Sequence, residues 1–364
     1  MAGPRKPNDE QKPKRVTLSD VARLAGLSPA AASMILSGRP DTRLSAEAHA
    51  RVMAAAEALD YRPNVAARSL RTDRTQSIAF ISDVVATTRF ATGLIRGALA
   101  AAEKAAHVML VLETGGEPAR ETQAMKAALD RQVDGIIFAA MRAREVFVPD
   151  VKLPVPVVML NATSPRFPTA VLPDEAKGGY DAVSLIAQAC ISSGIALLGQ
   201  SDAAEAGLFR STPVSRRVAG IRAEMKRRGL AFVAEESCWN WEPDEGYRLT
   251  RRLLRRFPDL KALLCMNDRL AFGAYQALAE AGRAIPHEVA IVSFDNDELA
   301  AYLRPGLTTI ALPHEEMGKL AVDLLLAGGS KAEHLVPMPI VMRGSLASTA
   351  LPAPELPRRQ PLAQ

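Results

Sequence analysis

The stretch TLSDVARLAGLSPAAASMILSG, residues 17–38, has the pattern of two short helices joined by a tight turn. Thr17 and Ser28 stand where helix N-caps are favoured, because a hydroxyl there accepts a hydrogen bond from a free backbone N–H. Pro29 follows the second cap at the first helical position, where proline is tolerated best. Gly26 separates the two segments and ends the first. The stretch therefore predicts a helix-turn-helix pair, which often places its second helix in the major groove of DNA.

A third helix completes this unit. Ser45 is a candidate N-cap for AEAHARVMAAAEALDY, residues 46–61, and apolar residues recur at helical spacing in all three segments. The expected apolar stripes are Val21 with Leu24, Ala32 with Ile35 and Leu36, and Val52 with Ala56 and Leu59. Three short helices over about 45 residues match the size of a DNA-binding headpiece.

Positive charge is concentrated at the start of the chain. The net charge is +5 over 364 residues. Residues 1–76 contain 13 Lys and Arg against 8 Asp and Glu, whereas the remaining residues contain 32 of each. A basic head on a neutral body suits a domain that binds a polyanion, and a solvated basic tail is the other interpretation of the charge alone.

The segment RPNVAARSLRTDRTQS, residues 62–77, follows the third helix. Pro63 ends one element, and Asn64 can cap a short helix over residues 65–70. A helix of this length is marginal in water, so it requires a partner on which to fold.

Short apolar runs alternate with helical patterns from residue 77 onward. The first series of runs is SIAFIS (77–82), HVMLVL (107–112), DGIIFA (134–139) and VPVVML (155–160), and the second is GIALLG (194–199), KALLCM (261–266) and EVAIVSF (288–294). The helical patterns between them lie near residues 93–105, 119–131, 176–190, 214–228, 244–256 and 269–282. The runs indicate fully buried parallel strands, so we expect two similar α/β subdomains with a cleft between them. Ligands of such sheets bind at the carboxyl ends of the strands.

Several classes of protein are disfavoured. No run approaches the roughly 18 apolar residues of a membrane span, and the N-terminal segment is polar with no apolar signal core. The cysteines, Cys190, Cys238 and Cys265, are far apart and indicate buried thiols of a reducing cytoplasm. Neither a metal-binding histidine spacing nor a phosphate-binding glycine loop is present. We therefore expect a cytoplasmic protein that is not an enzyme and carries no metal or cofactor.

Seven segments occur together in a specific order: TLSDVARLAGLSPAAASMILSG, RPNVAARSL, VDGII, SRRVAGI, CMNDRLAFGAYQAL, IPHEVAIVSFDNDELA and LRPGLTTI. In this order and spacing, from about Val16 to Arg343, the chain resembles the LacI/GalR-type transcriptional regulators. The resemblance implies an all-α helix-turn-helix headpiece, a hinge helix, and an α/β core of two similar parallel-sheet subdomains like the periplasmic binding proteins. It also implies a homodimer that acts on a palindromic operator in double-stranded DNA.

On this basis we divide the chain into five regions. They are a disordered basic tail (1–15), the headpiece (16–62), the hinge helix and linker (63–76), the effector-binding core (77–348) and a disordered tail (349–364). Within the core, we assign residues 77–172 with 304–330 to the first subdomain, and 173–303 with 331–348 to the second.

The resemblance implies which headpiece residues face DNA. They are Ser28, Pro29, Ala30, Ser33, Met34 and Ser37. Thr17 joins them on other grounds, because the helix N-terminus at Thr17 offers free N–H groups to phosphates. The position of Met34 is often Arg in the family, which can form two hydrogen bonds with a guanine, and Met cannot. Pro29 and Ala30 offer only apolar contact, for example to a thymine methyl group. We therefore expect specificity to depend on such contacts, on phosphates held at the helix N-termini, and on deformation of the minor groove.

Residues 64–70 match the hinge helix of the family. The resemblance implies that Leu70 enters the minor groove as a wedge with Ala67 packed beside it. Asn64 can cap this helix, and Arg68 would contact phosphates whether the segment is a hinge helix or a linker. A marginal helix that gains its stability from the groove agrees with this role. The alternative is a plain linker.

Six core residues fall at effector-binding positions of the family: Phe90, Asp174, Arg217, Trp241, Asn267 and Asp295. Carboxylates and an amide for hydroxyl groups, with aromatic faces for C–H surfaces, suit a carbohydrate-like ligand. Each has another interpretation, since Asp295 could cap the next helix, Trp241 could belong to the core, and Arg217 could form a surface ion pair.

We expect an effector-controlled transcriptional regulator, most simply a repressor, and leave open whether its effector is an inducer or a corepressor. A dimer is favoured over a tetramer because prolines in the tail forbid a C-terminal helix: Pro352, Pro354, Pro357 and Pro361. The alternative is a solute-binding protein or a sugar-processing α/β enzyme with an incidental basic head.

Overall fold

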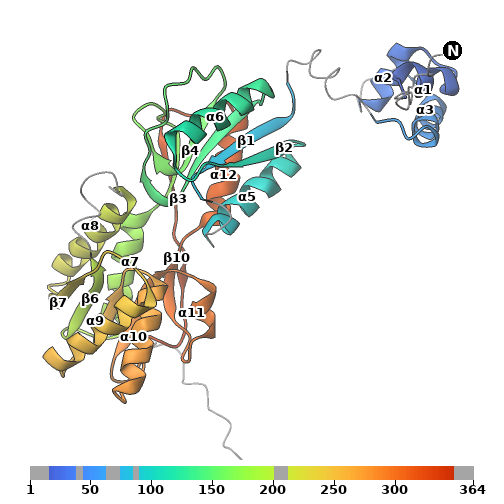
Figure 1. Cartoon of the computed structure of the whole chain (residues 1–364). Coiled ribbons are helices and arrows are strands. Elements are labelled where there is room, and N and C mark those ends of the chain that lie inside the picture. Colours follow the sequence, from blue (N-terminus) through green and yellow to red (C-terminus); the bar gives the residue numbers. More distant parts are fainter. Residues whose placement is uncertain (1–15, 38–43, 63–73, 85–89, 201–211, 348–364) are drawn as a thin grey trace, which may run out of the picture. The chain divides into compact units, whose positions relative to one another are not determined.

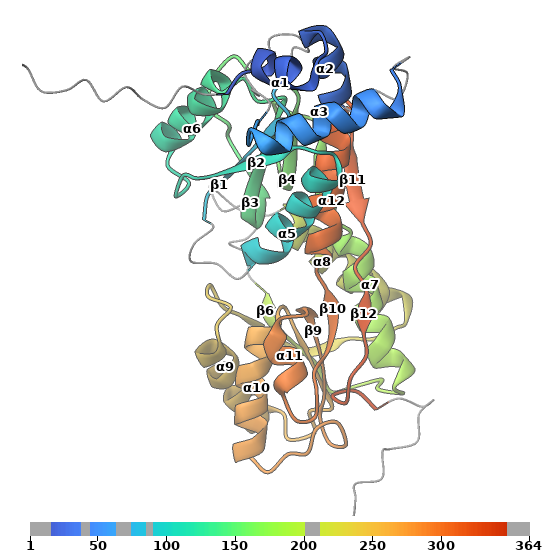
Figure 2. The same ribbon diagram turned by 90° about the vertical axis from the view of Figure 1, so that its right-hand side faces the viewer.

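The structure is a computed structural model of the chain, and it describes residues 16–37, 44–62, 74–84, 90–200 and 212–347. It divides into two compact units, Met1–Thr75 and Gln76–Gln364. The helices and strands of the two units are labelled in Figure 1 and seen from a second direction in Figure 2.

The first unit contains three helices, α1 (Leu18–Ala25), α2 (Pro29–Leu36) and α3 (Ala46–Ala58). Their N-caps are Thr17, Ser28 and Ser45, and each hydroxyl accepts a backbone N–H three residues later. Asp20 completes a capping box by accepting the Thr17 N–H at 3.0 Å. Gly26 ends α1 with a φ of +66°, a left-handed conformation that favours glycine. The predicted helix pair, its caps and its turn are confirmed.

The core of the first unit is small and built largely from alanine. It contains Val21, Ala22, Ala25, Ala32, Ile35, Ala48, Val52, Ala55 and Ala56, with Leu36 and Leu59 packed against it. One predicted core position is wrong, because Leu24 is 57% exposed. Val21 and Ala25, four positions apart, form the buried stripe of α1 instead, and Leu24 falls beside it.

The second unit begins with a six-stranded sheet in the order β11-β5-β4-β3-β1-β2. Its strands, all parallel, are β1 (Ser77–Ser82), β2 (Val108–Glu113), β3 (Gly135–Glu145), β4 (Val157–Thr163), β5 (Ala170–Pro173) and β11 (Glu333–Val336). Helices α5 (Phe90–Lys104) and α12 (His314–Leu326) pack together, and α6 (Pro118–Asp130) packs on β1. These three helices cover the sheet (Figure 1).

Alternate residues of β1 enter two separate hydrophobic clusters. Ile78 and Phe80 pack in the cluster with α5 and α12, whereas Ala79 and Ile81 pack in the cluster with α6. Burial on both faces is what a continuous apolar run predicts. The prediction is wrong for β2, which lies at the sheet edge and leaves Val108 65% exposed.

A second six-stranded sheet has the order β12-β10-β9-β8-β6-β7. Its strands are β6 (Ile195–Gln200), β7 (Phe232–Ser237), β8 (Ala262–Cys265), β9 (Ala290–Asp295), β10 (Thr308–Ala311) and β12 (Ile340–Val341), of which β12 is antiparallel. The helices are α7 (Glu175–Gln188), α8 (Thr212–Arg227), α9 (Pro243–Arg256), α10 (Asp268–Glu280) and α11 (Glu298–Tyr302). The alternation predicted from the sequence is present in both sheets.

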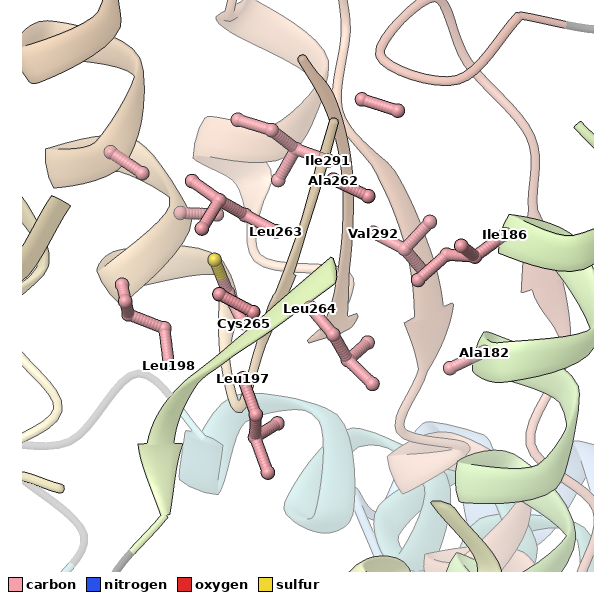
Figure 3. Packing of buried hydrophobic residues seen from close by; sticks show 14 of the residues in the cluster. Ala182, Ile186, Leu197, Leu198, Ala262, Leu263, Leu264, Cys265, Ile291 and Val292 are labelled. Atoms are coloured by element: carbon pink, nitrogen blue, oxygen red, sulfur yellow. The ribbon is translucent and has the colours of Figure 1, made fainter. Parts of the chain in front are cut away.

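The core of this second sheet is one continuous cluster of aliphatic side chains. Figure 3 shows Ile186 of α7 beside Val292 of β9, within a layer that Leu197 and Leu264 continue. Helix pairs α7–α8 and α9–α10 pack closely on this sheet. Glycine makes the second contact possible, because a Cβ on Gly273 would lie 1.9 Å from the carbonyl oxygen of Pro243.

The chain passes between the two sheets three times, after β5, between β10 and α12, and between β11 and β12. Two of our segment assignments need correction here. Residues 304–330 were expected in the first subdomain, but β10 belongs to the second sheet. Residues 331–348 were expected in the second, but β11 extends the first sheet by pairing with β5. Both are short strands whose place is set by tertiary pairing rather than by an apolar run.

Among the described residues, no helix is long and apolar enough to cross a membrane.

The cysteines differ in exposure. Cys238 and Cys265 are buried as expected, but Cys190 is exposed. It follows α7 in a left-handed conformation with a φ of +59°, so the expectation of a buried thiol is wrong there.

Candidate functional site

Polar side chains gather at the carboxyl ends of strands in the second sheet. Asp295 ends β9, and Asn267 lies two residues after the end of β8. Arg217 of α8 reaches the same place, since its Nη1 donates to the carbonyl oxygen of Met266 at 2.6 Å and its Nη2 lies 3.9 Å from Asp295 Oδ1. Trp241 joins the group through its carbonyl oxygen, which accepts a hydrogen bond from Asn267 Nδ2 at 3.2 Å. This is the edge at which open α/β sheets bind ligands.

Arg217 is held by a residue that the sequence analysis did not single out. Its Nε donates to Glu175 Oε2 at 2.6 Å, and its Nη2 donates to Glu175 Oε1 at 2.8 Å. Both side chains are at most 3% exposed, so this is a buried two-point ion pair. The guanidinium also lies over the Phe294 ring, 4.2 Å from its centroid. Burial by itself would lower the pKa of Arg217. The negative charges of Glu175, Asp295 and Asp268 have the opposite and larger effect, so the pKa is raised and Arg217 stays charged.

Asp295 occupies a strained and largely buried position. Its φ of +105° is a conformation that side-chain-bearing residues rarely adopt, and such strain is typical of functional sites. Burial raises the pKa of Asp295, and the positive charge of Arg217 offsets only part of this rise, so that the pKa is about 8. At neutral pH the carboxyl can therefore both donate and accept hydrogen bonds. The alternative role as a helix cap is wrong, because Asp297 caps α11.

Asp268 lies behind this group and is fully occupied by neighbours. Its carboxylate accepts hydrogen bonds from the hydroxyls of Ser293 and Thr309, and from the Asp297 backbone N–H at 2.7 Å. Burial raises the pKa of Asp268, and these hydrogen bonds offset only part of this rise, so that the pKa is about 6. Asp268 thus ties α10 to β9 and β10 and fixes the backbone next to Asp295.

Three of the remaining predicted residues also form hydrogen bonds that stabilise the fold. Asn267 caps α10 by accepting the Leu270 N–H at 2.9 Å, and Asp174 caps α7. Trp241 Nε1 donates to the Gly199 carbonyl oxygen at 2.8 Å. Phe90 is the first residue of α5, and its side chain lies outside the described part of the structure. The structure therefore groups Arg217, Trp241, Asn267 and Asp295, with Asp174 next to Glu175.

In the first unit, the predicted DNA-facing side of α2 is open to solvent. Ser28, Pro29, Ala30, Met34 and Ser37 are exposed, and Ser33 is half-buried. Thr17 at the N-terminus of α1 is exposed as well. The opposite side of α2 faces the core through Ala32 and Ile35. The predicted hinge residues Asn64, Ala67, Arg68 and Leu70 lie outside the described residues.

Comparisons with known proteins agree with both units. The family model for bacterial regulatory proteins of the lacI family matches residues 17–64, and that for a periplasmic binding protein-like domain matches residues 193–346. The ribose operon repressor of Escherichia coli (strain K12) is 31% identical over 316 residues, which cover 85% of this chain and 92% of the relative. The chain belongs to the LacI family. This LacI-family chain is also 27% identical over 327 residues to the HTH-type transcriptional repressor PurR of Vibrio vulnificus (strain CMCP6), covering 87% of this chain and 93% of the relative.

Solved structures share the fold of this LacI-family protein. The Lac repressor dimer bound to operator and the anti-inducer ONPF superposes with a TM-score of 0.70 at 24% identity, covering 92% of this chain and all of that chain. A complex of the transcriptional regulator CelR with cellobiose gives a TM-score of 0.59 at 22% identity, covering 91% of this chain and all of that chain. As a LacI-family regulator, the protein is a DNA-binding transcription factor under effector control and not an enzyme.

Proposed function

We propose that this protein is a cytoplasmic homodimer that represses transcription from a palindromic operator and that a small, carbohydrate-like molecule controls it. The observation that carries the proposal is the cluster around Arg217 and Asp295 at the carboxyl ends of the second sheet. Its Asp295 carboxyl can donate and accept hydrogen bonds at the carboxyl end of β9, and such a group suits the hydroxyl groups of a polyol. The operator and sugar complexes of the two structural relatives support the same kind of partners.

The proposed mechanism uses the three chain crossings between the sheets. A ligand that contacts Asp295 while also touching the first subdomain changes the angle between the subdomains, and this angle shifts the hinge helices at residues 64–70. DNA affinity and effector affinity are then coupled reciprocally. Whether the effector releases the operator or promotes its binding depends on which angle the ligand favours.

The exposed side of α2 supports a particular way of reading DNA. Pro29, Ala30 and Met34 carry no hydrogen-bond donor that could recognise a guanine in the major groove. We infer that thymine-methyl contacts, phosphates at the N-terminus of α2 and the Leu70 wedge supply the specificity. Operator selection should yield sites without a strong guanine preference opposite Met34, and a strong one would contradict this mode of reading.

A gel-shift experiment with genomic fragments at two salt concentrations tests the proposed function. We expect binding to a few fragments, with log K falling against log salt by about 0.9 for each phosphate neutralised. Failure to bind any fragment would refute the regulator and favour a solute-binding protein or an enzyme.

Two variants separate the parts of the proposal. Leu70→Ala should weaken operator binding and leave the core folded, and an unchanged affinity would reject the wedge. Asp295→Ala should abolish the effector response while basal operator binding persists, and a normal response would remove Asp295 from the site.

A further inference from the structure

The charge of Arg217 is compensated from within the protein. Glu175, at the start of α7, occupies both Nε and Nη2 of the guanidinium, and the Met266 carbonyl oxygen occupies Nη1. The two-point fork is the part of arginine that best fits a phosphate or a carboxylate. Here that fork already holds a carboxylate, so an arriving anion finds it occupied.

The neighbouring acids add to this effect. In the cluster around Arg217, one guanidinium faces three carboxyl groups, those of Glu175, Asp268 and Asp295. Asp268 is saturated by its own hydrogen bonds, and Asp295 is the most exposed of the three acids, with its side chain 10% exposed. An anion placed against Arg217 would approach Glu175 closely in a weakly screened environment, where like charges repel strongly.

We propose that Glu175 is a specificity-determining residue that makes this site reject anionic effectors, such as sugar phosphates and sugar acids, and admit uncharged polyhydroxy compounds. The inference rests on the proposed function, in which an effector binds at Arg217 and Asp295. Glu175 acts by neutralising Arg217, and it need not contact the ligand. The competing interpretation is that the ion pair only fastens α7 to α8.

Glu175→Gln distinguishes these interpretations. The variant keeps the side-chain shape but removes the carboxylate that holds the Arg217 fork, so a small anion should bind beside the guanidinium. The probes are inorganic sulfate and inorganic phosphate at constant ionic strength, and the readout is the melting temperature of the full chain followed by tryptophan fluorescence. We expect a saturable rise in melting temperature for the variant, with an apparent Kd at least about tenfold tighter than in the wild type.

The double variant Glu175→Gln, Arg217→Met is the matched control. It carries the same change at Glu175 but lacks the guanidinium beside which an anion would bind. This control should therefore respond to sulfate and phosphate as the wild type does. An equal response of Glu175→Gln, the control and the wild type would overturn the proposal. Glu175→Asn replaces Glu175→Gln if the latter does not fold.

The wild-type protein supplies a test that needs no variant. Aldopentoses and aldohexoses are compared, one by one, with their own phosphate esters and sugar acids in the same melting assay. The proposal requires that no anionic member gives a saturable shift, whichever neutral sugars bind, and one anion that binds as tightly as its parent sugar would overturn it. If the wild type binds no fragment in the gel-shift experiment, the proposed function is refuted instead. The melting assay reports the charge selectivity separately from that result.

Discussion

Replacement of Arg217 by methionine should destabilise the second subdomain strongly. The substitution removes the two hydrogen bonds to Glu175 and the one to Met266. It also leaves the Glu175 carboxylate, only 2% exposed, without a cation. Breaking a buried ion pair from one side typically costs about 3–5 kcal/mol in the free energy of unfolding, because the remaining charge is uncompensated. We expect a loss of that size for Arg217→Met.

The double variant Glu175→Met, Arg217→Met should recover most of this loss. With both charges gone, the site contains apolar side chains of similar length, and such replacements are often neutral or stabilising. The two single losses should therefore greatly exceed the loss in the double variant, as expected for residues in direct contact.

Urea unfolding followed by tryptophan fluorescence measures these differences. Both tryptophans of the chain, Trp239 and Trp241, precede α9 in the second subdomain, so the fluorescence reports on this region. Arg216→Met is the control, because its partner Glu333 is partly exposed and a surface pair contributes about 1 kcal/mol at most. If Arg217→Met loses no more than Arg216→Met, or if the single losses simply add in the double variant, the account of the ion pair is refuted.

Three further outcomes follow from the structure. The pKa of Asp295 is about 8 in the folded chain, against a usual value near 3.8. Protonation of Asp295 therefore stabilises the folded chain fully below pH 4, and this stabilisation is lost as the pH rises through 8. The urea midpoint should therefore fall more between pH 5 and pH 9 in the wild type than in Asp295→Asn, and equal slopes would contradict this. Ser28→Ala should destabilise α2 by about 1 kcal/mol, so its backbone amides in the full chain should exchange hydrogen about fivefold faster while those of the core stay unchanged. Gly273→Ala should cost about 3 kcal/mol or more of core stability, because its Cβ would clash with the Pro243 carbonyl oxygen, and a wild-type urea midpoint would show that α9 and α10 are not in close contact.

Local patterns in the sequence were enough to predict most elements. The caps at Thr17, Ser28 and Ser45 are formed by residues three positions apart, so their chemistry is visible in the sequence itself. Apolar runs likewise located the central strands of both sheets. The errors in the two sheets arose at edges, where an apolar run such as that of β2 is partly exposed, and in short strands such as β10 and β11, whose sheet depends on distant partners.

The candidate site was predicted only in part, and for the same reason. Asp295 and Arg217 follow from the family resemblance, but Glu175 looks in the sequence like an ordinary acid in the first turn of a helix. Its role comes from contact with a residue 42 positions later. A buried carboxylate of this kind becomes recognisable only once the helices α7 and α8 lie side by side.

The central claim is that one molecule binds both an operator and an effector and couples the two. The most direct test takes a genomic fragment retained in the gel-shift experiment and the neutral sugar that raises the melting temperature most. The Kd for the operator is measured with and without the sugar, and the Kd for the sugar with and without the operator. The account predicts that both affinities change by the same factor, and that Asp295→Ala abolishes the change. A sugar that binds the wild-type core and leaves the Kd for the operator unchanged would contradict it.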